Sequence, residues 1–170
     1  LEDPKGEKVT TAALAERLSV SEAALYRHFA SKAQMFEGLI EFIETTLFSF
    51  VNRITAETTD GVAQAEQAVV MLLSFAEKNP GMTRVLIGEA LVNEDERLQA
   101  RINQLVDKLE AALRQSLRIA QAANGWHGDA QADAAVLIAY VLGRWQLYAK
   151  SGFKRTPQDG WALQRKFLFG

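Results

Sequence analysis

The sequence predicts an all-α protein. Only three prolines, at positions 4, 80 and 157, interrupt its 170 residues, and between them apolar side chains recur at three-and-four spacing. No segment shows the alternation of apolar and polar residues that is typical of a β-strand. The predicted helices cover residues 11–18, 22–29, 32–56, 62–78, 81–92, 95–123, 130–150 and 158–168.

Start and stop signals support these helices in order along the chain. Short polar side chains that can cap a helix N-terminus stand near the start of four of them: Ser21, Ser31, Asn93, and Asp159 before the last apolar run. Residues 79–81 read Asn-Pro-Gly, which ends one helix and opens the next. The segment 124–128 begins with Asn-Gly and ends with Gly, so it predicts a loop.

The pattern divides the chain into two domains. Residues 1–31 carry short helices with a small core, whereas residues 32–170 carry long helices with continuous apolar faces. The helix 32–56 links the two domains. Its core stripe, counted at 3.6 residues per turn, is Phe36, Ile40, Ile43, Leu47, Val51 and Ile54.

The helix 130–150 is apolar on nearly all sides. One side is smooth with alanine and glycine, at Ala134, Ala135, Ala139 and Gly143, and bulky side chains occupy the remainder. Such a helix needs cover on two sides, and its own domain can supply only one. We therefore expect a homodimer formed through helices 130–150 and 158–168. The residues expected near its seam are Leu142, Trp145, Tyr148 and Phe167.

Composition excludes several classes of function. The chain has no cysteine, which removes disulfides, thiol catalysis and iron–sulfur clusters and makes a reducing cytosol the expected compartment. Its two histidines, His28 and His127, lie too far apart in sequence to predict a metal site. The longest apolar stretches are about half the roughly 20 residues that a membrane span needs. We expect neither a membrane segment nor a secretory leader.

No pattern indicates an enzyme or a cofactor. There is no glycine-rich phosphate loop, and only the loop 125–129 places a histidine close to an aspartate, without a serine nucleophile nearby. The net charge of −2 gives no general attraction to nucleic acid, so any DNA contact must come from a local patch.

The segment VTTAALAERLSVSEAALYRHFASK, residues 9–32, has the spacing of a helix-turn-helix. Ala15 is the small residue expected where the two helices cross, and residues 19–21 form the turn. The small core consists of Leu14, Leu18, Val20, Leu25 and Phe29. The second helix would lie in the major groove of DNA.

This placement in the major groove predicts two groups of DNA-contacting side chains. The expected phosphate or sugar contacts are Thr10, Thr11, Tyr26, Arg27, His28 and Lys32. The residues expected nearer the bases are Ser21, Glu22 and Ala23. The alternative is a helical hairpin without any role at DNA, since residues 9–32 carry a net charge of only +1 from three basic and two acidic side chains. The turn also has Ser19 where such motifs usually have glycine.

The ending Tyr26, His28, Phe29 and Lys32, after a threonine-led helix, resembles the DNA-binding segment of the TetR family of transcriptional regulators. The resemblance implies an all-α homodimer that binds palindromic double-stranded DNA. It also implies a further helix at the start of the domain, which we expect to be missing before Leu1. Farther along, EKNPGMTRVLIGEAL and RLQARINQL are similar to the nucleoid occlusion factors of that family.

A second site is indicated by the helix faces. The core stripe of helix 62–78 is Val62, Ala65, Val69, Leu72 and Ala76. Met35 and Phe42 lie off the core stripe of helix 32–56, and the side chains opposite the core stripe of helix 62–78 are Gln67, Met71, Ser74 and Lys78. With Asn79 these side chains would wall an exposed groove. The alternative is that Phe42 and Met71 pack under a neighbouring helix of the same subunit.

The resemblance implies an occupant for this groove. It suggests that the partner-binding residues, Phe42, Phe50, Met71, Ser74, Lys78 and Asn79, hold the C-terminal tail of the tubulin-like division protein FtsZ, with two dimers on one DNA site. Position 50 departs from the pattern, because Phe50 stands where a basic residue is expected. The protein would be cytoplasmic and nucleoid-associated. A ligand-responsive repressor and a helical adaptor that does not bind DNA remain as alternatives.

Overall fold

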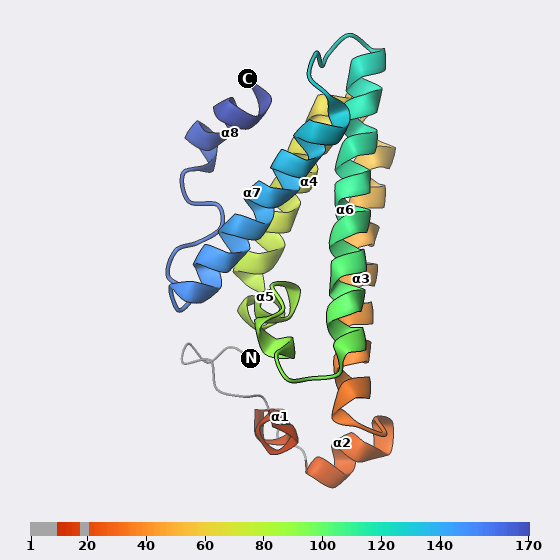
Figure 1. Cartoon of the computed structure of the whole chain (residues 1–170), viewed down its shortest axis with the longest axis vertical. Helices are drawn as coiled ribbons and strands as arrows, with labels where there is room; N and C mark the ends of the chain where they lie inside the picture. Colours follow the sequence, from red (N-terminus) through yellow and green to blue (C-terminus); the bar gives the residue numbers. More distant parts are fainter. Residues whose placement is uncertain (1–9, 18–20) are drawn as a thin grey trace.

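The computed structural model describes residues 10–17 and 21–170, and in the first two helices the side chains of six residues lie outside that description: Thr11, Leu14, Arg17, Glu22, Leu25 and Tyr26. Within these ranges the chain is helical (Figure 1). The elements are α1 (Thr11–Arg17), α2 (Glu22–His28), α3 (Lys32–Glu57), α4 (Gly61–Lys78), α5 (Pro80–Leu86), the 3₁₀ turn η1 (Glu89–Leu91), α6 (Glu96–Ala122), α7 (Ala130–Lys150) and α8 (Trp161–Phe169). The all-α prediction is confirmed.

The four long helices form two layers. In Figure 1, α6 lies in front of α3 and α7 lies in front of α4, while α1 and α2 lie below α3. The core between the layers is built from the predicted stripes: Phe36, Ile40, Ile43 and Leu47 of α3 and Ala65, Val69, Leu72 and Ala76 of α4 are buried. Val51 and Ile54 are half-buried against that core.

Some of the predicted N-cap residues cap their helices in the structure and others do not. The Ser31 hydroxyl accepts from the Gln34 N–H at 3.2 Å at the start of α3, as predicted. At α6 the cap is Asp95 instead of Asn93. Asn93 has a φ of 64° and shapes the preceding turn.

The predicted helix 81–92 is too long. The helix α5 ends at Leu86, because Gly88 adopts a φ of 79° that a helix cannot continue through. A Cβ at Gly88 would lie 2.4 Å from Oε1 of Gln99, so that side chain would have to move to admit it. The predicted helix 158–168 also begins later, at Trp161, with Gly160 at its N-cap instead of Asp159.

The helices α4 and α6 approach very closely at one point. A Cβ built on Gly61 would lie 2.2 Å from the Ser116 carbonyl oxygen and 2.4 Å from the Ala120 nitrogen. Asp60 caps α4 directly before this contact by accepting from the Val62 N–H at 2.9 Å. The glycine thus lets the N-terminus of α4 rest on the backbone of α6, which closes the bundle at that end.

The helix α7 contributes its bulky side to its own subunit. The Trp145 side chain is 0% exposed and its indole N–H donates to the Leu72 carbonyl at 3.0 Å. Tyr148 is 5% exposed, and its hydroxyl donates to the Glu77 carbonyl at 3.0 Å. The prediction that Trp145 and Tyr148 lie at a dimer seam is therefore wrong, because both are covered within one chain.

Candidate functional sites

The helix-turn-helix is built around two hydroxyl caps. The Thr10 Oγ1 accepts from the Ala13 N–H at 3.1 Å at the start of α1, and the Ser21 Oγ accepts from the Ala24 N–H at 3.1 Å at the start of α2. Ala15 is 4% exposed, in agreement with its predicted place at the helix crossing. Ser19 and Val20 of the turn lie outside the described residues.

The described side chains of α2 leave a surface for contact. Ala23, Arg27 and His28 are exposed, and the two basic residues occupy the last turn of the helix. The side chains of Thr11, Glu22 and Tyr26 lie outside the described residues, so their predicted contacts stay predictions. A cation in the last turn is also favoured by the helix dipole, which keeps Arg27 and His28 compatible with a stable α2.

Lys32, the predicted phosphate ligand at the start of α3, is engaged inside the chain. Its Nζ lies 2.5 Å from Oε1 of Glu94, in the turn before α6, and these side chains are 21% and 12% exposed. The same ammonium lies 5.8 Å from the centre of the Phe36 ring. The ion pair joins the end of the DNA-reading segment to the C-terminal domain, and a phosphate would have to compete with it.

The ring of Phe29 also joins the two domains. A Cβ on Gly38 would lie 3.3 Å from an edge carbon of that ring, so the glycine gives the ring a flat surface on α3. Arg97 and Arg101 of α6 form ion pairs with Glu37 and Glu44 of α3. The helix-turn-helix is thereby anchored to a helix that is itself fixed in the bundle.

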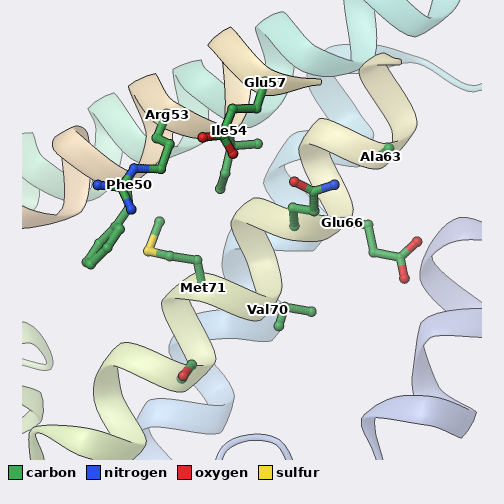
Figure 2. Close-up of a pocket in the computed structure, with 10 residues that line it drawn as sticks. Phe50, Arg53, Ile54, Glu57, Ala63, Glu66, Val70 and Met71 are labelled. Atoms are coloured by element: carbon green, nitrogen blue, oxygen red, sulfur yellow. The ribbon is translucent and has the colours of Figure 1, made fainter. Parts of the chain in front are cut away.

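A surface pocket of about 520 Å³ lies between α3 and α4 (Figure 2). Of the predicted groove residues, Phe50, Gln67, Met71 and Ser74 line it. Its floor is largely apolar, with Ile54 and Val70 beside Met71. Sequence reasoning missed the charged lining residues Arg53, Glu57 and Glu66. The signal for Arg53 was present, because it follows Phe50 by one turn.

The other predicted groove residues lie outside the pocket lining. Phe42 is 55% exposed, which contradicts the alternative that it packs under a neighbouring helix. It shares a helix face with Arg53, three turns farther along α3. Lys78 is exposed at the C-terminus of α4, seven residues after Met71 and on the same face. Asn79 has a structural role, since its Nδ2 donates to the Phe75 carbonyl at 2.8 Å.

The two ends of the pocket differ in charge. Arg53 lies with its Cζ 6.0 Å from the centre of the Phe50 ring. Glu66 lines the opposite end and accepts from Nε and Nη2 of Arg165 on α8 at 2.6 and 2.8 Å, whereas Glu57 lies one turn after Arg53 on α3 (Figure 2). These hydrogen bonds raise the pKa of the Arg165 guanidinium. The pair connects the wall of the pocket to the C-terminal helix.

An apolar face without cover runs along α7 and α8. Ala135, Ala139 and Gly143 are exposed, whereas Ala134 is buried. A Cβ built on Gly143 would meet no heavy atom within 4 Å beyond the neighbouring backbone of its own helix. The larger exposed apolar side chains are Val136 and Leu147 on α7 and Leu163 and Phe167 on α8, the last 91% exposed. Leu142, half-buried, lies at one margin of this face. Phe167 and Leu142 remain predicted interface residues, whereas Val136, Leu147 and Leu163 replace Trp145 and Tyr148.

No cluster of three or more acidic or histidine side chains in the described ranges is arranged to hold a metal ion. No helix in those ranges combines the length and apolarity needed to cross a bilayer.

Comparison with known families identifies the class of protein. Residues 7–39 match the family described as bacterial regulatory proteins, tetR family, and residues 59–170 match the SlmA-like form of the tetracyclin repressor-like, C-terminal domain. The chain therefore belongs to the tetR family of bacterial regulators, which are DNA-binding proteins that form dimers and are not enzymes.

Within this family the chain is similar to proteins named nucleoid occlusion factor SlmA. The protein of Alteromonas mediterranea is 48% identical over 161 residues, which cover 94% of this chain and 83% of the relative. That of Vibrio cholerae is 48% identical, with 92% and 83% covered. That of Shewanella pealeana is 46% identical over 170 residues, with 99% and 86% covered. The chain belongs to the SlmA group of the tetR family.

Proposed function

We propose that this protein is a nucleoid occlusion factor, which binds palindromic double-stranded DNA as a homodimer and holds the C-terminal tail of FtsZ along the α3–α4 surface. The observation that carries the proposal is 48% identity to SlmA proteins over nearly the whole chain, combined with an open pocket between α3 and α4. The predicted DNA contacts, Thr10, Thr11, Ser21, Glu22, Ala23, Tyr26, Arg27, His28 and Lys32, belong to this proposal.

The α3–α4 surface suits a short tail that carries both acidic and apolar residues. The pocket offers apolar contact from Phe50, Met71 and Ile54, which an apolar side chain of the tail can cover. Arg53 in the pocket and Lys78 at the end of α4 supply positive charge for its carboxylates. Phe42 extends the apolar surface beyond the pocket.

Linkage explains why one chain would carry both activities. If DNA holds the dimers in the arrangement that binds the tail best, tail affinity rises where the DNA site lies, and the tail strengthens DNA binding by the same free energy. Two dimers on one DNA site would set this arrangement. FtsZ assembly would then be antagonised over the chromosome and left alone elsewhere.

A ligand-responsive repressor is the alternative function. It would need room for an effector in the helical core, and Trp145 occupies the space between α4 and α7. The pocket between α3 and α4 is at the surface, with Phe50 and Arg53 exposed beside it. This arrangement favours a macromolecular partner over an enclosed small molecule.

The test is a charge reversal, Lys78→Glu, assayed with a labelled FtsZ tail peptide in the presence and absence of a DNA site. We expect tail binding to be lost, because like charges would meet at the rim, and DNA affinity to stay near wild type. The matched control is Lys154→Glu, which reverses an exposed charge in the loop that joins α7 to α8. Full tail affinity in Lys78→Glu at low salt would contradict the assignment, and a wild-type protein that binds DNA but never the tail would favour the repressor.

A further inference from the structure

Arg53 is an exposed cation in the pocket whose charge is not used within the described part of the chain. No carboxylate in those ranges lies within ion-pair distance of its guanidinium, although Glu57 is only one turn away on α3. The other basic side chains that border α3 all have an acidic partner. They are Lys32, Arg97, Arg101 and Lys108.

The position of Arg53 is nevertheless defined. Its guanidinium carbon lies 6.0 Å from the centre of the Phe50 ring, within the range of a cation–π contact. Figure 2 shows both side chains at one end of the pocket, with the thioether of Met71 reaching toward them from α4. A guanidinium held in this way loses less freedom on binding than a free lysine or arginine side chain.

The described residues at the opposite end of the pocket offer no unpaired cation to a carboxylate. Glu66 lines this end, and both of its carboxylate oxygens already accept from Arg165. Between the two ends the lining is apolar, with Ile54 and Val70. The pocket therefore has a direction: an unpaired cation at one end, apolar contacts in the middle and the Glu66–Arg165 ion pair at the other.

We propose that Arg53, supported by the ring of Phe50, binds one carboxylate of an acidic–apolar peptide in this pocket, and that the peptide's apolar side chain lies on Met71 and Val70. The proposal deepens the proposed function and rests on it, because the peptide is taken to be the FtsZ tail. Charge complementarity fixes the orientation, since Arg53 is the one cation among the residues that line the pocket, and the acidic residue of the peptide must point toward it. The planar fork of arginine can bind a carboxylate through two parallel hydrogen bonds. Arg53 would then supply, at this end of the pocket, the positive charge that Phe50 lacks, and the ring of Phe50 would support it.

The experiment measures binding of the FtsZ tail peptide to the full chain and to Arg53→Gln, with Arg155→Gln as the matched control in the loop that joins α7 to α8. We expect Arg53→Gln to weaken binding roughly fivefold to tenfold and the control to change it by less than about twofold. The same measurement is made with tail peptides in which each acidic residue is replaced singly by the corresponding amide. Each replacement forms a double-mutant cycle with Arg53→Gln. One of these replacements should weaken binding to the wild type and have no further effect on Arg53→Gln.

Phe50→Leu separates the supporting role of the ring from its apolar contact. Leucine keeps an apolar surface but offers no π face, so we expect the loss caused by Arg53→Gln to become smaller in this background. An unchanged tail affinity in Arg53→Gln, together with loss of binding in Lys78→Glu, would overturn this inference and leave the proposed function standing. If every acidic residue of the peptide still contributes equally in Arg53→Gln, the assigned carboxylate contact is also overturned. A wild-type chain that does not bind the peptide would overturn both proposals.

Discussion

Removal of the Glu94 charge should strengthen DNA binding. In the structure the Lys32 ammonium lies 2.5 Å from Glu94, so a DNA phosphate and this carboxylate compete for one cation. The substitution Glu94→Gln keeps the size of the side chain and an acceptor oxygen while removing the negative charge. A DNA phosphate could then bind Lys32 without displacing a carboxylate.

The size of the effect follows from the burial of the pair. Exposed ion pairs contribute about 0.2–1 kcal/mol, and this pair, with side chains 21% and 12% exposed, should lie at the top of that range. About 1 kcal/mol corresponds to roughly a fivefold gain in DNA affinity. One additional phosphate contact should also steepen the slope of log K against log salt by about 0.9. The same substitution should lower the free energy of unfolding, since the bundle loses a contact between α3 and the turn before α6.

The assay is fluorescence anisotropy with a labelled duplex of mixed sequence over a series of salt concentrations. Glu96→Gln is the matched control, because it removes an exposed negative charge two residues farther along the chain. Lys32→Ala should weaken binding to all sequences and, in a double variant, abolish the gain in affinity that Glu94→Gln produces. If Glu94→Gln has the affinity and salt slope of the control, Glu94 does not compete with DNA and the reasoning is refuted. If Lys32→Ala instead relaxes the preference at one base pair, Lys32 is not a phosphate ligand.

Three further predictions concern packing and assembly. Gly61→Ala should cost about 3 kcal/mol of unfolding free energy in urea titrations, because its Cβ would lie 2.2 Å from the Ser116 carbonyl; a cost below about 1 kcal/mol would show that α4 can shift freely. Gly143→Arg should leave the helical content intact and yield monomers in light scattering, and a dimer of normal stability would exclude this face as the interface. Trp145→Phe should cost about 2 kcal/mol through the lost hydrogen bond to Leu72 and the space left behind, yet leave a sedimentation-derived dimer constant unchanged.

Much of the fold could be predicted from local sequence, because helical periodicity and capping act within a few residues. The core stripe of α3 and the exposed face of α4 with Met71 and Lys78 follow directly from 3.6 residues per turn. Ser31 could be recognised as a cap, since its partner is only three residues away. The helix-turn-helix is equally local, with all its parts between residues 9 and 32.

The errors have a common origin in contacts between distant segments. Periodicity gives the direction of a side chain around its own helix axis, but it does not say which neighbour covers that direction. Trp145 was expected at a subunit seam, and only the packing of α7 on α4 turns it toward Leu72, 73 residues earlier in the chain. Lys32 was expected to be free for phosphate, and Glu94, 62 residues later, binds it.

The proposed functional surfaces also combine features that the sequence predicts with features that only the tertiary structure decides. The amino acids at Phe50 and Met71 and their places on two helix faces could be read from the chain, because each face is a property of one helix. These residues line one pocket, with Arg53 at one end and Glu66 at the other, only because α3 and α4 lie side by side. The pairing of Glu66 with Arg165 also depends on the position of α8 beside α4. Those placements depend on side-chain packing across the whole bundle, in which segments far apart in sequence compete for the same buried surface.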